Sequence, residues 1–122
     1  MGKQPMVEQP LFSKWCGHAC ISMITGEDIL HIAKKLQNYN ELSLEKEVMW
    51  YLYDKGFKVK LIRKFDITPE EIPNNSIVRI EDINENGHFV LKQNDVFKDP
   101  NVGIVLNYIS RKRITHYLEI EE

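Results

Sequence analysis

Apolar residues recur every three or four positions in the first half of the chain, which is the spacing of one buried helix face. The spacing predicts helices over residues 16–25 and 29–36, and a third that starts after Ser43 as its N-cap and ends at Gly56. Residues 1–14 are expected to be extended coil. The three apolar stripes are Cys16, Ala19, Cys20, Met23 and Ile24; Ile29, Ile32, Ala33 and Leu36; and Leu44, Val48, Tyr51 and Leu52.

Alternation of apolar and polar residues replaces this pattern in the second half, as is typical of strands. A one-turn helix is predicted at 68–72, turns at 84–87 and 94–95, and either a strand or a helical turn at 105–110. Helices first and strands second indicate an α+β fold, a helical layer on an antiparallel sheet, in a single domain over 1–122. The predicted strands cover 57–61, 76–80, 88–93, 96–98 and 115–121.

Length and charge exclude several classes of function. The 122 residues are enough for one domain with its own core. The net charge of −2 gives no basic footprint for nucleic acid. No apolar run reaches the roughly 18 residues of a membrane span, and the first residues do not form a signal peptide. We therefore expect a cytoplasmic protein, with a mature secreted form as the alternative and the oligomeric state left open.

The two cysteines, Cys16 and Cys20, are four residues apart on one predicted helix. Their side chains run parallel on that helix, which suits a disulfide poorly. His18 points to a different face, so these three residues make a weak metal site. We expect reduced thiols, no bound metal and no cofactor.

Cys16 lies in the first turn of its helix, where the positive end of the helix dipole favours a thiolate, the nucleophilic form of cysteine. Gly17 is expected to keep the entry to the thiol uncrowded and to let backbone N–H groups approach an oxyanion. Gln9, seven residues earlier, is a candidate second donor to that oxyanion, with Gln4 as the alternative.

His88 follows Gly87 at the start of an apolar strand, a rigid position for a general base. The tight turn at Asn94-Asp95 returns the next strand along the first, and this brings Asp99 near His88. A thiol, an imidazole and a carboxylate in that order are the parts of an activated nucleophile.

Each of these residues also has an ordinary structural interpretation. Cys16 alone is more typical of a small core residue, Gln9 of solvated coil, His88 of a strand edge and Asp99 of an Asp-Pro turn. The other histidines are weaker candidates for the base. His18 is too near Cys16 in sequence, His31 lies on a polar helix side, and His116 has no acidic residue at a suggestive spacing.

Taken together, these motifs resemble the papain-like cysteine peptidases, and especially the bacteriocin-processing group that cleaves double-glycine leader peptides. Trp15 stands where that group usually has Asp. The resemblance spans nearly the whole chain in the same order. It rests on Gln9, on Cys16-Gly17-His18-Ala19-Cys20-Ile21-Ser22-Met23, on Gly87-His88-Phe89-Val90-Leu91, and on Asp99-Pro100.

The resemblance implies Cys16 as nucleophile, His88 as general base and later acid, Asp99 as the residue that orients His88, and Gln9 as an oxyanion donor. The expected function is hydrolysis of a peptide or amide bond in a peptide or protein substrate through a thioester. Two alternatives stay open. One is deamidation or acyl transfer by the same triad, and the other is a catalytically silent peptide-binding module of the same fold.

Overall fold

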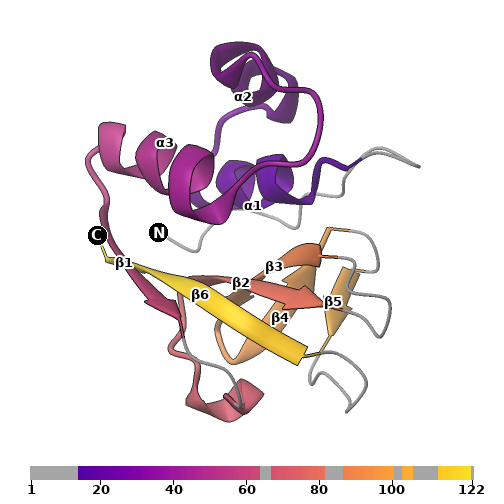
Figure 1. The fold of residues 1–122 in the computed structure, drawn as a ribbon, viewed down its shortest axis with the longest axis vertical. Coiled ribbons are helices and arrows are strands. Elements are labelled where there is room, and N and C mark those ends of the chain that lie inside the picture. The colour runs from indigo at the N-terminus through magenta and orange to yellow at the C-terminus, as the bar shows by residue number, and fades with distance from the viewer. Residues whose placement is uncertain (1–13, 64–66, 82–86, 101–102, 106–112, 122) are drawn as a thin grey trace.

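The computed structural model describes residues 14–63, 67–81, 87–100, 103–105 and 113–121. A helical layer lies on one face of a sheet (Figure 1). The helices α1 (Cys16–Thr25) and α2 (Ile29–Leu36) have the predicted bounds. Gly26 ends α1 in the left-handed conformation, with φ of 78°, and its N–H bonds to the carbonyl of Ser22.

The third predicted helix consists of two parts, a π-helical turn η1 (Leu44–Val48) followed by α3 (Met49–Asp54). Ser43 occupies the predicted N-cap position in an extended conformation, but its side chain makes no cap hydrogen bond. Instead, the Glu47 carboxylate accepts the backbone N–H of Ser43 at 3.2 Å. The N–H of Val48 bonds to the carbonyl of Ser43 at 3.0 Å, which is the wider spacing of a π-helix.

Within the described residues, six strands form one antiparallel sheet in the order β1-β6-β2-β3-β4-β5. Pro69–Glu71 is a short 3-10 helix, η2, close to the predicted one-turn helix. The strand β5 was not among the predicted strands. Only its last residue, Val105, belongs to the segment for which the sequence left a strand and a helical turn open. The strands are β1 (Lys58–Arg63), β2 (Ser76–Glu81), β3 (Gly87–Gln93), β4 (Val96–Asp99), β5 (Gly103–Val105) and β6 (Arg113–Glu121).

Apolar side chains fill both faces of the sheet. Alternate residues of a strand point to opposite faces, so Leu91 packs with the helical layer and Val90 packs on the other side. All four predicted core residues of the third helix are buried, from Leu44 to Leu52. The second cluster consists of Ile67, Ile72, Val78, Ile80, Val90, Phe97 and Ile114.

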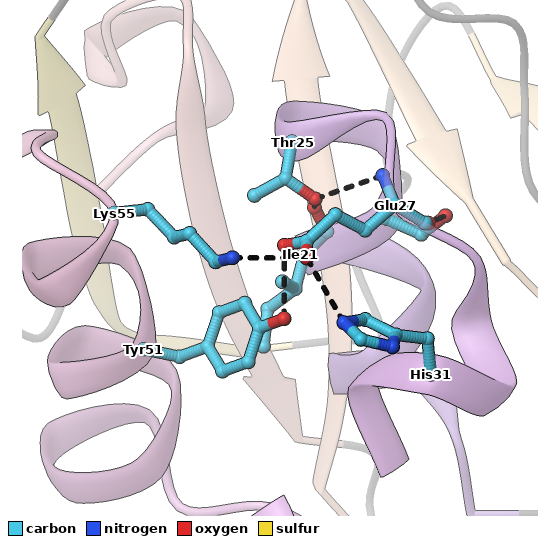
Figure 2. Close-up of polar contacts among 7 residues, drawn as sticks. Ile21, Thr25, Glu27, His31, Tyr51 and Lys55 are labelled. Atoms are coloured by element: carbon cyan, nitrogen blue, oxygen red, sulfur yellow. Dashed lines mark hydrogen bonds and ion pairs between the residues drawn. The ribbon is translucent and has the colours of Figure 1, made fainter. Parts of the chain in front are cut away.

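Glu27, in the connection between α1 and α2, ties the three helices together (Figure 2). Its carboxylate accepts a hydrogen bond from the Tyr51 hydroxyl at 2.9 Å and from Lys55 Nζ at 3.0 Å, both on α3 or at its end. His31 Nε2 of α2 lies 3.3 Å away. Burial alone would raise the pKa of Glu27, but the hydrogen bonds from Lys55 and Tyr51 outweigh it and hold the pKa below its ordinary value.

Replacing Glu27 by Gln tests this contribution. A carboxylate whose pKa is lowered by folding stabilises the protein above the pKa of the free side chain, and this stabilisation is lost as the pH falls through the lower, folded value. We expect Glu27→Gln to lower the unfolding free energy by about 1 kcal/mol at pH 7. In urea titrations the gap to wild type should close below about pH 4. Glu70→Gln, an exposed carboxylate on η2, should cause no such change, and a gap that is constant with pH would contradict this role.

Candidate active site

Cys16 is the first residue of α1, as predicted, and its side chain is buried, with only 6% of its surface exposed. The residue before it, Trp15, makes no side-chain hydrogen bond that would cap the helix. The N–H groups of a helix's first turn have no intrahelical partner, and the helix dipole makes this end positive. The thiol therefore lies at a helix end that suits a negatively charged sulfur and a developing oxyanion.

Gly17 sets how closely this helix end approaches the sheet. A Cβ atom at Gly17 would lie 3.2 Å from Phe89 Cδ2 of β3 and 3.3 Å from Leu42 Cβ. The expectation that Gly17 keeps the entry to the thiol uncrowded is therefore incomplete, because Phe89 and Leu42 occupy the space beside it. The missing side chain lets the first turn of α1 pack directly against the residue that follows His88.

The β3–β4 hairpin brings His88 and Asp99 together, as the sequence predicts. Its turn consists of Asn94 and Asp95, both left-handed with φ of 53° and 63°, which is the geometry of a two-residue hairpin. The strand register, extended by one pair, sets Asp99 opposite Val90, two residues along the strand from His88. His88 Nε2 lies 2.6 Å from Asp99 Oδ1.

The Asp99 carboxylate is almost completely buried, with 1% of its side chain exposed, and such a group needs a hydrogen-bonding partner. His88 supplies it through Nε2, so its other ring nitrogen, Nδ1, is left for the thiol. Burial alone would lower the pKa of His88. Hydrogen bonds to Asp99 and Cys16, with the negative charge on both, outweigh burial and raise the pKa of His88 to about 9. The imidazole is therefore protonated at neutral pH and pairs with the sulfur on one side and the carboxylate on the other.

Cys20, one turn further along α1, differs from Cys16. It is fully buried, and burial together with the charges of Cys16 and Asp99 raises the pKa of its thiol well above the ordinary value. Both cysteines are free. Cys20 thus packs in the core, as its place on the predicted apolar stripe of this helix indicates.

Three other histidines occupy different environments. His18 is buried and its Nε2 lies 2.7 Å from the carbonyl oxygen of Asn38. His31 is exposed and pairs with Glu27 on the helical layer.

Gln9, the predicted second oxyanion donor, and the alternative Gln4 lie outside the described residues.

His116 has an acidic partner, Glu45, which lies at no spacing that the sequence could suggest. Its Nε2 lies 3.0 Å from Glu45 Oε1 of η1, and its Nδ1 lies 2.9 Å from the hydroxyl of Thr115. Thr115 is only 4% exposed, and its hydroxyl also bonds to the side chain and the carbonyl of Arg79. A substrate therefore has no access to this hydroxyl. The contact between Glu45 and His116 joins the helical layer to β6 and is structural.

The described ranges hold neither a cluster of metal-binding side chains nor a membrane-spanning helix. Among these residues, no three His, Cys, Asp or Glu side chains gather where they could hold a metal ion. None of the helices in the described part of the chain is long and apolar enough to cross a membrane.

The fold is that of a papain-like peptidase domain. A solved structure with this fold is the peptidase domain of Streptococcus ComA, a bifunctional ABC transporter involved in a quorum-sensing pathway. The TM-score is 0.62 over 94% of this chain and 96% of that one, with 15% of residues identical. The predicted α+β class and the resemblance to this peptidase group are thereby confirmed at the level of the fold. No protein-family model and no curated protein sequence matches the chain.

Replacing Asp99 by Asn tests the electrostatic pairing. Loss of the carboxylate charge should lower the pKa of His88, which is about 9 in the native protein, by at least about one unit. The measurement is an NMR titration of the His88 ring. Asp54→Asn, an exposed charge removed from α3, should leave the titration unchanged. A native His88 that titrates near 6.5 would contradict the pairing.

Gly17→Ala tests the close packing of α1. Alanine is a better helix former than glycine by about 1 kcal/mol, so in open space this change would stabilise the protein. Because a Cβ atom meets Phe89 and Leu42 within 3.3 Å, we expect no gain in thermal stability. We also expect at least a several-fold slower alkylation of Cys16, since the helix end shifts away from His88. A more stable variant with an unchanged alkylation rate would show that the contact is unimportant.

Proposed function

We propose that this chain is a cysteine peptidase that hydrolyses a peptide or amide bond through a thioester on Cys16. The observation that carries the proposal is the contact of His88 with the buried Asp99 carboxylate on one side and with Cys16 on the other. The papain-like fold, shared with the ComA peptidase domain, supports the same conclusion. His88 and Asp99 belong to the β3–β4 hairpin, and Cys16 comes from the first helix of the chain, which supports a site assembled from separate segments.

In the first half of the reaction, the Cys16 sulfur attacks the substrate carbonyl carbon. The carbonyl oxygen becomes an oxyanion, which the Cys16 backbone N–H and the side-chain amide of Gln9 would stabilise. As the C–N bond breaks, protonated His88 gives its proton to the leaving amine. The acyl group is left on Cys16 as a thioester, and His88 is neutral.

In the second half, a water molecule replaces the amine. Neutral His88 takes a proton from the water as it attacks the thioester carbonyl. The C–S bond then breaks, which releases the carboxylic acid and restores the pair of sulfur and protonated imidazole. Throughout, Asp99 holds the His88 ring in orientation and stabilises its positive charge.

Two unpaired thiols are typical of a reducing compartment, which supports the cytoplasm as the place of action. The proposed mechanism needs no metal or organic cofactor. The substrate is a peptide or protein, because the amide bond is the group that this arrangement attacks.

The first test is the reactivity of the thiols. We expect iodoacetamide to modify Cys16 much faster than Cys20 near pH 7, since Cys20 is buried and stays protonated. His88→Ala should abolish the difference, while His31→Ala, which removes an exposed histidine far along the sequence from the site, should preserve it. Mass spectrometry of the labelled peptides measures both rates. Equal, slow labelling of the two thiols in the native protein would refute the proposal.

A peptide library then identifies the reaction. Incubation with the native protein, but not with Cys16→Ala, should produce new peptide termini with the addition of water. A shift of about one dalton without cleavage would instead identify deamidation, and a cross-link would identify acyl transfer. If iodoacetamide labels Cys16 rapidly but no peptide in the library is changed, the chain is a binding module with a reactive thiol.

A further inference from the structure

Two aromatic side chains, Trp15 and Tyr39, meet at the start of α1, the helix that begins with the proposed nucleophile. Trp15 precedes Cys16 in the chain, and its indole Nε1 donates a hydrogen bond to the backbone oxygen of Tyr39 at 2.7 Å. The two rings lie 6.0 Å apart at 44°. Trp15 also stacks on His18, with ring centres 5.1 Å apart. We call this surface, consisting of Trp15 and Tyr39, the aromatic step.

The aromatic step rests on the buried His18 ring and on a loop that several hydrogen bonds hold. His18 is completely buried, and because a carbonyl only accepts, its Nε2–H donates to the Asn38 oxygen. Burial lowers the pKa of His18, so the ring is neutral and adds no charge below the step. The Asn38 amide donates to Glu47 Oε2 at 2.7 Å, and its Oδ1 accepts the N–H of Asn40 at 2.8 Å. The loop that carries Tyr39 is therefore fixed from both sides.

None of these bonds uses the Tyr39 ring itself. The loop is held through the backbone oxygens of residues 38 and 39, whereas the ring is 50% exposed to solvent. Trp15 is also partly exposed. Fixed aromatic rings with one free face are a common means of binding, since they offer a large apolar contact at little cost in entropy.

The position of the step points to the substrate. The loop between α2 and η1, which carries Tyr39, passes beside the end of α1 where Cys16 lies (Figure 1). His88, the second residue of β3, bonds to the Cys16 side chain at this same place. A peptide whose carbonyl carbon meets Cys16 thus has its neighbouring side chains within reach of the two rings.

We propose that the aromatic step is a specificity surface, which binds a large apolar side chain of the substrate within three residues of the cleaved bond. The inference rests on the proposed peptidase function and adds the class of residue that is recognised. An apolar side chain fits because both rings are partly exposed and the imidazole that Trp15 stacks on is buried and neutral. Glycine or a charged residue at the same place would leave the rings uncovered.

The decisive experiment compares cleavage profiles over a synthetic peptide library that varies three residues on each side of the cleaved bond. The native protein should prefer Leu, Met or Phe at one of these positions, with kcat/KM at least ten-fold above that for Gly. In Tyr39→Ala the preference should fall below three-fold, and in Tyr39→Phe, which keeps the ring, it should persist. Tyr53→Ala, which removes an even more exposed ring from α3, should match the native protein.

Iodoacetamide labelling separates this inference from the proposed function. Tyr39→Ala should label Cys16 at the native rate, since the ring acts on the substrate and not on the thiol. Cleavage with no apolar preference, a preference for Lys or Arg, or an apolar preference that survives in Tyr39→Ala would overturn the specificity role and leave the peptidase proposal intact. Slow labelling of Cys16 in the native protein would refute the peptidase proposal instead.

Direct binding gives a readout that does not depend on catalysis. The chain has two tryptophans, so Trp50→Phe leaves Trp15 as the only indole. In that variant, N-acetyl-Leu-Leu-amide should shift the fluorescence of Trp15 to shorter wavelength in a saturable way, and N-acetyl-Gly-Gly-amide should not. Addition of Tyr39→Ala should weaken the apparent Kd for the leucine peptide at least ten-fold. Equal responses to the two peptides, or none, would overturn the inference.

Discussion

The close approach of α1 to β3 is the contact on which the rest of the site depends. The first turn of α1 and the first residues of β3 meet where Gly17 has no side chain, so Phe89 and Leu42 pack against the helix backbone. Cys16 and His88 are the chain neighbours of the two residues in contact. A wider separation here would break the hydrogen bond between thiol and imidazole, even with both elements correctly folded.

Two separate networks of charged side chains serve different purposes in this protein. At the site, the buried Asp99 carboxylate keeps His88 protonated, and that positive charge faces the sulfur. On the helical layer, Glu27 gathers donors from α2 and α3 and fixes the helices relative to one another. One network tunes a reactive group, whereas the other maintains the layer that positions it.

The sequence predicts what depends on local pattern. The bounds of α1 and α2 follow from apolar spacing, and the Asn94-Asp95 turn follows from residues that tolerate left-handed backbone. Contacts between distant segments leave no such signal. The pairing of Glu45 with His116, the π-helical turn before α3 and the strand at Gly103 depend on how the layers pack, so the sequence did not reveal them.

The same distinction between local pattern and long-range contact applies to the residues of the candidate site. Cys16, His88 and Asp99 could be named because each belongs to a motif and because a two-residue turn fixes the register of His88 and Asp99. Tyr39 could not, since it lies in a segment that carries only a helix-breaking signal. Trp15 was visible as a departure from the usual Asp of the peptidase group, but its partner across the loop was not.

The short β3–β4 hairpin has a consequence for how this chain folds. His88 and Asp99 belong to one hairpin, which closes by local contacts and forms early relative to long-range pairing. Cys16 reaches them only when α1 docks from the far end of the chain, which is a late, entropically costly step. The imidazole and carboxylate thus meet before the thiol arrives, and a chain that is still folding carries a cysteine without its activating partners.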